Sequence, residues 1–191
     1  MKRLRATFAL RVTEELADIL HRLKFLAESG VNLGMTRLYG RAAPGERVVE
    51  ATPGTSGPHY TVVATLGVHG VQAPLLFEGA MTTLTFETYL TDVLAPTLRR
   101  GDILLMDNLS AHKSDQARAT IEARGVQLIF LPPYSPDLNP IEKCWSKVKA
   151  ALRAAKARTW DDLVAALRDA LLSVSRSDVL AWFAHCGYEM A

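Results

Sequence analysis

Apolar and polar residues follow two different periods along this chain, and the period changes near residue 80. In the first part, short runs rich in β-branched residues are separated by turn-forming segments, a pattern typical of strands. Residues 13–22 precede these runs with the apolar spacing of a helix. Three adjacent runs joined by turns (47–51, 60–68 and 71–77) predict an antiparallel meander. The predicted strands lie at 23–28, 47–51, 60–68 and 71–77.

Beyond residue 80 the apolar positions take the spacing of amphipathic helices. The short apolar runs 103–106 and 126–131 are exceptions, and we interpret them as buried parallel strands because helical segments alternate with them. One helix is predicted from apolar positions spaced by three and four residues, with Gly101 ending the segment; these positions are Phe86, Leu90, Val93, Leu94 and Thr97. Further helices are predicted at 114–124, 140–155, 160–172 and 178–186.

This order predicts an α/β fold with a mixed five-stranded sheet, in which three antiparallel strands are followed by two parallel ones and helices flank the sheet. We expect residues 1–22 to form a helical lead-in, 23–158 the main domain and 159–191 a helical extension of that domain. A chain of 191 residues is long enough for one domain with a real core. The last two helices either cover the sheet or mediate self-association.

Composition excludes few classes of function. The net charge is +2, so attraction to an acidic polymer would have to come from local patches. Cys144 and Cys186 lack the spacing of a metal site, and we expect reduced thiols in a cytosolic protein. No apolar run approaches the length of a membrane span, so no membrane association is expected.

Two acidic residues end elements that should meet in this fold. Asp107 follows the run 103–106, and Glu142 begins the helix 140–155, with 34 residues between them (108–141). Sites in such sheets lie at the carboxyl ends of parallel strands, and paired carboxylates bind the divalent cations of phosphate chemistry. We therefore predict Asp107 and Glu142 as catalytic metal ligands. The alternative for Asp107 is an acid that caps a turn.

Glu142 has a structural alternative of its own. Asn139 suits the N-cap position and Glu142 stands at N3, so the pair could form a capping box. The four prolines within 132–140 favour a functional role, because they stiffen the preceding loop more than a plain cap requires.

The helix that begins near Glu142 continues as a basic track. At 100° per residue, Lys149, Arg153 and Lys156 fall within about 40° of the line through Glu142. Basic side chains beside a metal site suit a phosphodiester polymer, so we predict these three residues as DNA contacts. An ordinary solvated basic face is the alternative.

The segments 105–113 (Leu-Met-Asp-Asn-Leu-Ser-Ala-His-Lys) and 131–142 (Leu-Pro-Pro-Tyr-Ser-Pro-Asp-Leu-Asn-Pro-Ile-Glu) closely resemble the catalytic domain of mariner-superfamily DDE transposases, nearest to the bacterial insertion-sequence branch. The resemblance covers roughly residues 23–158, and the proline-rich run is highly specific. It implies a ribonuclease H-like fold of the retroviral integrase superfamily. It also implies Mg²⁺ or Mn²⁺ as cofactor (two ions in an intact relative), DNA as partner, and DNA cleavage followed by strand transfer. A cytoplasmic, nucleoid-associated bacterial protein is expected.

The family carries a third acid on the first strand, in a Phe-x-Asp-Glu-(Ser/Thr)-Gly context. The matching stretch here reads Phe-Leu-Ala-Glu-Ser-Gly, in which Ala27 occupies the aspartate position. Glu28 is adjacent, but successive strand residues point to opposite faces, so we expect it to be a weak substitute. Loss of even an outer partner of a metal costs about 10–100-fold. We therefore predict severely impaired catalysis.

Three functions stay open. The first is an impaired transposase enzyme, and the second is a non-catalytic DNA-binding remnant or partner subunit. About 22 residues precede the first strand, too few for the helix-turn-helix domains of the family. We therefore expect either a split reading frame, in which a separate N-terminal half binds DNA, or a truncated copy. Self-association is also expected. The third function is a structure-specific nuclease. Asn108, His112 and Lys113 are candidate DNA contacts, with solvated turn residues as the alternative.

Overall fold

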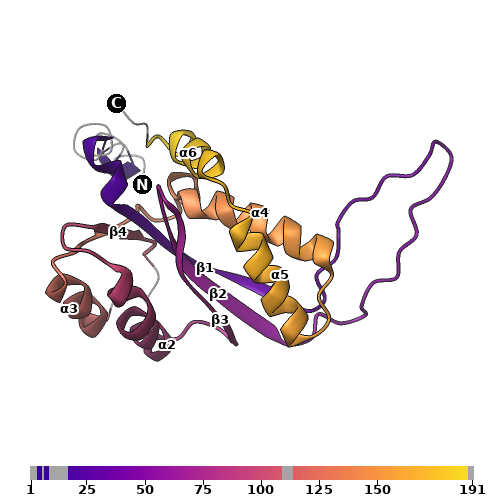
Figure 1. Ribbon diagram of the computed structural model, residues 1–191, viewed down its shortest axis with the longest axis horizontal. Coiled ribbons are helices and arrows are strands. Elements are labelled where there is room, and N and C mark those ends of the chain that lie inside the picture. The colour runs from indigo at the N-terminus through magenta and orange to yellow at the C-terminus, as the bar shows by residue number, and fades with distance from the viewer. Residues whose placement is uncertain (1–3, 6, 9–16, 109–113, 189–191) are drawn as a thin grey trace.

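A mixed five-stranded sheet forms the centre of the computed structural model, which describes residues 4–5, 7–8, 17–108 and 114–188 (Figure 1). The strand order is β3-β2-β1-β4-β5. The first three strands pair antiparallel, while β4 runs parallel to β1 and β5 runs parallel to β4. The predicted α/β sheet is therefore confirmed. Its strands are β1 (Leu23–Asn32), β2 (His59–Gly67), β3 (Gly70–Glu78), β4 (Ile103–Met106) and β5 (Gln127–Phe130).

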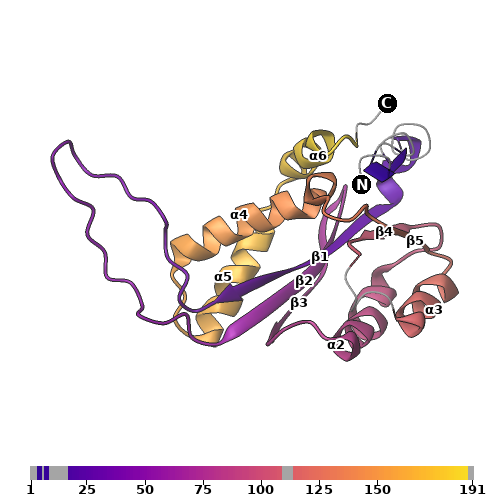
Figure 2. The same cartoon turned by 180° about the vertical axis from the view of Figure 1, so that it is seen from behind.

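Helices cover both faces of the sheet (Figures 1 and 2). On one face lie α2 (Thr83–Thr88), the π-helix η3 (Tyr89–Leu94), the short η4 (Ala95–Thr97) and α3 (Asp115–Ala123). On the other lie α4 (Pro140–Ala155), α5 (Trp160–Leu172) and α6 (Arg176–His185). Two 3-10 helices, η2 (Ala17–Arg22) and η6 (Pro136–Leu138), precede β1 and α4. Within the described residues, no helix has the length and apolar character to cross a bilayer.

Alternation along β1 divides the interior into two cores. Phe25 and Ala27 face α4, α5 and α6, whereas Leu26 faces α2 and α3. Phe25 packs edge-on against Phe183 of α6 and against Tyr188, with ring centroids 5.3 and 4.8 Å apart. The face of β1 toward α4 is apolar over most of its length, with Leu23, Phe25, Ala27 and Val31, whereas the apolar residue on the opposite face is Leu26. The last two helices thus cover the sheet.

The segment between β1 and β2, residues 33–58, leaves the body as a long arm (Figure 1). The predicted strand at 47–51 lies in this arm and is wrong, because none of these residues belongs to a strand. Val48 and Val49 have high strand propensity, but propensity forms a strand only where a partner strand and a covering layer exist. Val49 is instead 89% exposed.

Other element boundaries shift for local reasons. The helix predicted over Phe86–Thr97 is broken into α2, η3 and η4, and Pro96 within it has no N–H to donate to the preceding turn. Helix α6 starts at Arg176 rather than 178, because Ser175 caps it in a capping box with Asp178. The predicted helix 13–22 is a 3-10 helix over Ala17–Arg22, and its start lies outside the described residues.

Candidate active site at the tip of β4

Asp107 directly follows β4, and the pairing of β4 with β1 places Ala27 beside it. Phe25 pairs with Leu105 in a parallel ladder, so two residues further along Ala27 stands opposite Asp107. Phe25, Ala27 and Leu105 belong to the core beneath α4, and alternation puts the Asp107 side chain on that same face. An acid at position 27 would be a direct neighbour of Asp107. Ala27 provides no oxygen there.

Glu28 belongs to the opposite face of the sheet. Its cross-strand partner on β2 is Val63, and Val63 lies in the core beneath α2 and α3. Residues directly opposite each other in an antiparallel pair share a face, so the Glu28 side chain leaves β1 away from Ala27 and Asp107. This register agrees with Glu28 as only a weak substitute for the missing acid, and its role stays a prediction.

Glu142 stands in the first turn of α4, and its helix is not capped by side chains. Asn139 is the N-cap residue, but its side chain makes no capping hydrogen bond, and its own N–H donates to the carbonyl of Pro136. The capping box that Asn139 and Glu142 might have formed is therefore absent. The Glu142 carboxylate is not used to hold the helix end and is available for chemistry.

The electrostatics of Glu142 link it to Asp107. Partial burial raises the pKa of the Glu142 carboxyl group even though solvent reaches the side chain. The positive charge of Lys149 opposes this rise, and the negative charges of Asp107 and, more weakly, Glu28 add to it. These interactions show that the two carboxylates are close enough to sense each other's charge. A cation between them would relieve both the burial and the repulsion.

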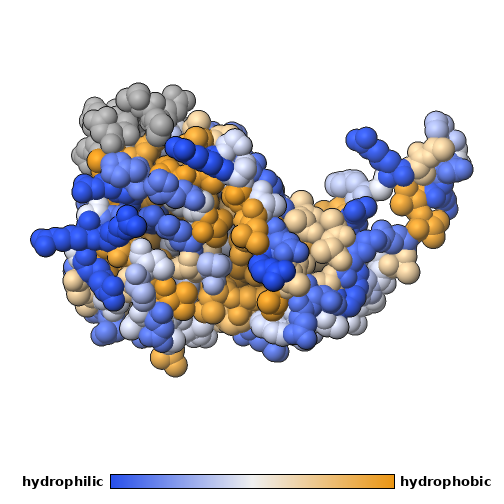
Figure 3. All heavy atoms as spheres, in the orientation of Figure 1, coloured by the Kyte–Doolittle hydropathy of each residue, from blue (hydrophilic) through white to orange (hydrophobic). Residues whose placement is uncertain are grey.

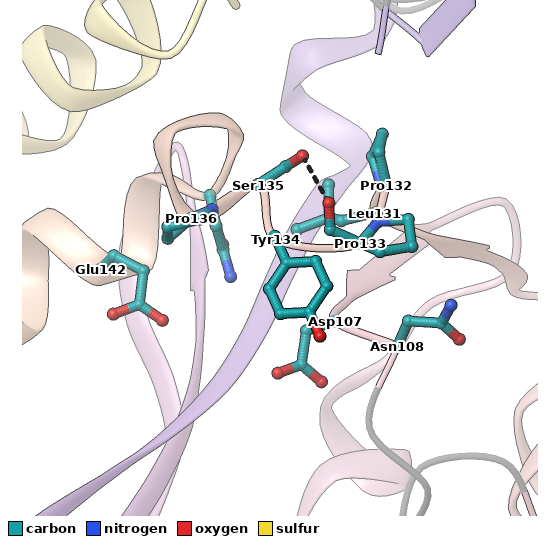
Figure 4. Close-up of a pocket in the computed structure, with 10 residues that line it drawn as sticks. Asp107, Asn108, Leu131, Pro132, Pro133, Tyr134, Ser135, Pro136 and Glu142 are labelled. Atoms are coloured by element: carbon teal, nitrogen blue, oxygen red, sulfur yellow. Dashed lines mark hydrogen bonds between the residues drawn. The ribbon is translucent and has the colours of Figure 1, made fainter. Parts of the chain in front are cut away.

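Both carboxylates line one pocket of about 360 Å³ (Figure 4). The loop between β5 and α4 forms most of its wall, and the Asp107 and Glu142 carboxylates point to the same side of that loop. The lining residues are Asp107, Asn108, Leu131, Pro132, Pro133, Tyr134, Ser135, Pro136, Asn139 and Glu142. The proline-rich loop that the sequence singles out therefore shapes the cavity in which the two acids meet.

A residue far away in sequence holds this loop. Arg5 donates to Ser135 Oγ at 2.7 Å and to both carboxylate oxygens of Asp137 at 3.0 and 2.5 Å. Ser135 is buried, and it also donates to the carbonyl of Pro133 at 3.3 Å. The guanidinium fork thus fixes the turn that leads into α4. Nothing in the local sequence around Arg5 indicates this contact, so sequence reasoning missed it.

Tyr134 was also missed as a separate feature. Its backbone adopts a left-handed conformation with φ of 55°, which is uncommon for a residue other than glycine, and its side chain is 88% exposed at the pocket. Such conformations concentrate at functional sites because the surroundings must hold them in place. The adjacent prolines provide that restraint, and the exposed ring offers a flat apolar surface beside the two acids.

The basic track on α4 is only partly available for binding DNA. Lys149 lies near enough to lower the pKa of Glu142, which agrees with the helical spacing, and Arg153 is half-buried one turn further on. Lys156 ends the helix in a left-handed conformation and forms an ion pair with Glu50 of the arm. Its side chain therefore joins α4 to the arm. The DNA-binding role of these residues stays a prediction.

The remaining sequence candidates cluster after Asp107. Asn108 is exposed and lines the pocket. His112 and Lys113 lie outside the described residues, so the structure places neither of them.

The donor set fits one divalent cation better than two. Asp107 and Glu142 supply carboxylate oxygens, and Asn139 lines the same pocket with a side chain 2% exposed, whose Oδ1 atom has no hydrogen-bond partner. Carboxylate and amide oxygens suit Mg²⁺ and Mn²⁺. Among the described residues, however, no group of three His, Cys, Asp or Glu could hold a metal. The bridging acid that two ions require is missing at Ala27.

Comparison with known proteins identifies a family for this chain. The family model of DDE superfamily endonucleases matches residues 22–164. The Tc1 transposase of Caenorhabditis elegans is 34% identical over 76 residues, which are 40% of this chain and 28% of the relative. The Tcb2 transposase of Caenorhabditis briggsae is 28% identical over 104 residues, 52% of this chain and 38% of the relative. This chain thus corresponds to less than half of either relative.

Solved structures of Mos1 transposase have the same fold. A pre-cleavage Mos1 transpososome superposes with a TM-score of 0.79 at 16% identity, over 97% of this chain and 58% of the Mos1 chain. The Mos1 catalytic domain with Raltegravir and Mg superposes with a TM-score of 0.74 at 16% identity, over 97% and 87%. The ribonuclease H-like fold is therefore confirmed. Since the family model matches most of its length, this chain belongs to the DDE superfamily endonucleases.

Proposed function

We propose that this chain is the catalytic part of a transposase that cleaves DNA and joins its strands, from the bacterial insertion-sequence branch of the superfamily. The observation that carries the proposal is the pocket in which Asp107 and Glu142 come together from the tip of β4 and the start of α4. Membership of the DDE endonuclease family supports the same chemistry. The Mos1 paired-end complexes with Mn and with Mg support these two metals as cofactors.

In this proposal the chain's own residues bind and orient the DNA. Asp107 and Glu142 hold Mg²⁺ or Mn²⁺, Lys149 attracts a phosphate beside them, and the exposed Tyr134 ring supports a nucleotide by stacking. The bound metal would supply activation of water and stabilisation of the leaving oxygen in phosphodiester cleavage. Rigid prolines and the Arg5 contacts keep the pocket in shape before DNA arrives, which limits the cost of ordering it.

We infer that catalysis is impaired in this chain. Ala27 stands opposite Asp107 and offers no ligand, and Glu28 leaves the strand on the other face. Loss of an outer metal partner alone costs about 10–100-fold in affinity or activity, and a direct ligand should cost more.

Metal-dependent nicking of a DNA duplex tests the function and the impairment together. We expect no measurable nicking by the unsubstituted chain with Mn²⁺, nicking by Ala27→Asp, and none by Ala27→Asp with Glu142→Gln. Asp161→Asn added to Ala27→Asp is the matched control, because it removes an exposed acid on α5 that does not line the pocket. Nicking by the unsubstituted chain would refute impairment, and no nicking by Ala27→Asp would refute the metal site.

A second candidate is a non-catalytic DNA-binding remnant or a partner subunit, and the alanine at position 27 favours it for this chain. In that case DNA binding persists while Ala27→Asp still fails to nick. Adding a full-length relative to the same reaction distinguishes a remnant from a partner subunit. A partner subunit would lower the relative's turnover in proportion to the amount of this chain.

The partner proposals follow from the same chemistry. DNA is the substrate, a separate N-terminal half supplies recognition of the transposon ends, and the site of action is the bacterial cytoplasm at the nucleoid. Solved Mos1 structures include a transpososome and a paired-end complex with a transposon end, which supports DNA as partner here. Self-association is supported by the arm, which exposes the apolar residues Leu38, Tyr39 and Val49.

A further inference from the structure

Four arginines gather where the three parallel strands begin, at the end of the sheet opposite Asp107. Arg22 immediately precedes β1, and Arg124 lies just before β5. A short turn separates Arg99 and Arg100 from the start of β4. The amino ends of neighbouring parallel strands meet at one edge of a sheet, so chain segments that are distant in sequence bring these side chains together. All four residues are exposed.

Two glycines let the arginines pack closely. Gly101 donates its N–H to the carbonyl of Gly125 at 2.9 Å, which joins the turns before β4 and β5. A Cβ atom built on Gly101 would stand 2.9 Å from Nη2 of Arg22, and one built on Gly125 would stand 2.8 Å from Cγ of Arg100. The arginine side chains thus lie directly over bare backbone. Both glycines also have positive φ, 88° and 69°, which makes a larger residue unfavourable there.

The neighbouring charges leave this surface positive. None of the ion pairs between described residues involves Arg22, Arg99, Arg100 or Arg124. Two acids lie nearby in the chain: Asp102 is buried and accepts from the backbone N–H of Arg99 at 2.9 Å, and Glu122 pairs with Arg118 at 3.6 Å.

The surface is also partly preorganised. Arg124 donates from Nη1 to the carbonyl of Ala95 at 2.9 Å, which holds its guanidinium in place. Lys24 is buried and donates to Gln72 Oε1 at 2.7 Å, and it lies near enough to Arg99 and Asp102 for their charges to act on it. In Figure 3, strongly hydrophilic side chains project from the end of the molecule where Figure 1 places the turn before β4.

We propose that Arg22, Arg99, Arg100 and Arg124 form a second DNA-binding surface, which holds the phosphate backbone of a duplex at the end of the sheet away from the catalytic pocket. Like charges grouped on one surface repel one another, and phosphates relieve that repulsion. Guanidinium groups match phosphate oxygens in a two-pronged geometry. In this proposal the arginines bind phosphates and not base edges, so binding here is independent of sequence. This proposal rests on the proposed function only for the choice of DNA as partner.

Salt dependence of binding to a short fluorescent DNA duplex tests the surface. We compare the unsubstituted chain with Arg99→Gln/Arg100→Gln between about 50 and 200 mM salt, where each lost phosphate contact lowers the slope of log affinity against log salt by about 0.9. The double variant should lose about 2 from that slope and bind more weakly at low salt. Arg168→Gln/Arg176→Gln is the matched control, because it removes the same charge from exposed arginines on α5 and α6.

A slope equal to that of the control variant would overturn the surface, and so would tighter binding to duplex RNA than to duplex DNA. Arg22→Gln alone, with an expected slope loss of about 1, repeats the test if the double variant fails to fold. The nicking assay separates the two proposals. Nicking by Ala27→Asp with an unchanged slope removes only the arginine surface, whereas a reduced slope without nicking removes only the catalytic proposal.

Discussion

Arg5 shows how a single side chain can decide the shape of a site far away in sequence. It reaches Ser135 and Asp137 in the loop that leads into α4, 130 and 132 positions further along the chain. Its charge and hydrogen bond hold the pKa of the Asp137 carboxyl group below its usual value. Since the same loop fixes where Glu142 enters the pocket, we regard Arg5 as a positioning residue.

Replacing Arg5 should loosen the metal pocket without touching a ligand. We expect Arg5→Ala, made in the Ala27→Asp chain, to weaken Mn²⁺ binding several-fold. The reason is that the turn at Ser135 and Asp137 loses the three hydrogen bonds that Arg5 donates to it. Arg5→Lys should lie in between, since a point charge cannot form the fork. Mn²⁺ affinity from electron paramagnetic resonance checks this. Unchanged affinity in Arg5→Ala, with loss in Glu142→Gln, would contradict a positioning role.

Among the α-helices α2 to α6, α4 is the exception in how it begins. Helices α2, α3, α5 and α6 each start with a serine or threonine whose side chain accepts from the backbone three residues on. The start of α4 is fixed instead by Pro140 and the stiff loop, which leaves Glu142 outside any cap. The helix is then tied to α6 through Lys147, whose ammonium group bonds Asp178 at 2.5 Å and the carbonyl of Ser173 at 2.9 Å.

This tie between α4 and α6 predicts a pH dependence of stability. Hydrogen bonds from Lys147 and then Ser175 lower the pKa of Asp178 from 3.8 to about 2. A carboxyl group with a depressed folded-state pKa stabilises the fold above its unfolded value, and this stabilisation disappears as the pH falls from about 4 toward 2. Asp178→Asn should therefore lower the free energy of unfolding at pH 7 and make little difference near pH 2.

Denaturant unfolding of both chains across this pH range measures the effect. Asp169→Asn is the control, because Asp169 is exposed on α5 and pairs with its neighbour Arg168, itself exposed. An Asp178→Asn difference that stays constant from pH 7 to pH 2 would contradict the linkage.

At the scale of the whole molecule, the arm is the feature that a monomer does not explain. It is anchored at its base, where Gly34 donates to the carbonyl of Ser56 at 3.1 Å and Arg158 donates to the carbonyl of Leu33 at 2.8 Å. Beyond the base it exposes apolar side chains, with Tyr39 90% and Val49 89% exposed. Apolar groups presented on an anchored extension are typical of a surface that another molecule covers.

We expect the arm to mediate self-association of the proposed transposase. Tyr39→Ser/Val49→Ser should shift the chain toward monomer in sedimentation-velocity experiments, because burial of these side chains against a second copy would be lost. Leu84→Ser on α2 removes an exposed apolar group from the body and should leave the association unchanged. A chain that is monomeric at every concentration before substitution would refute the expectation.

Much of the fold follows from local pattern. The strand 103–106 and the helices 140–155 and 160–172 appear at the predicted boundaries, because their apolar periods are long or strongly bounded. The predicted strand at 47–51 was wrong because local pattern alone is not enough to form a strand. Its valines have high strand propensity, but no strand lies beside them. Arg5 and the arginine surface were invisible for a related reason, since contacts between distant segments leave no local periodicity.

The sequence by itself determined which side chains can do chemistry: the aspartate after one strand, the glutamate after a proline-rich loop, and the alanine where a third acid is expected. Only the tertiary structure decided that Ala27 stands beside Asp107 on neighbouring parallel strands and that the Glu28 side chain points to the other face of the sheet. It also decided that Glu142 takes no part in a capping box at the start of α4. The physical reason is that residue type is a property of one position. A binding site is a property of distances, which form only when the sheet register and the helix packing are fixed together.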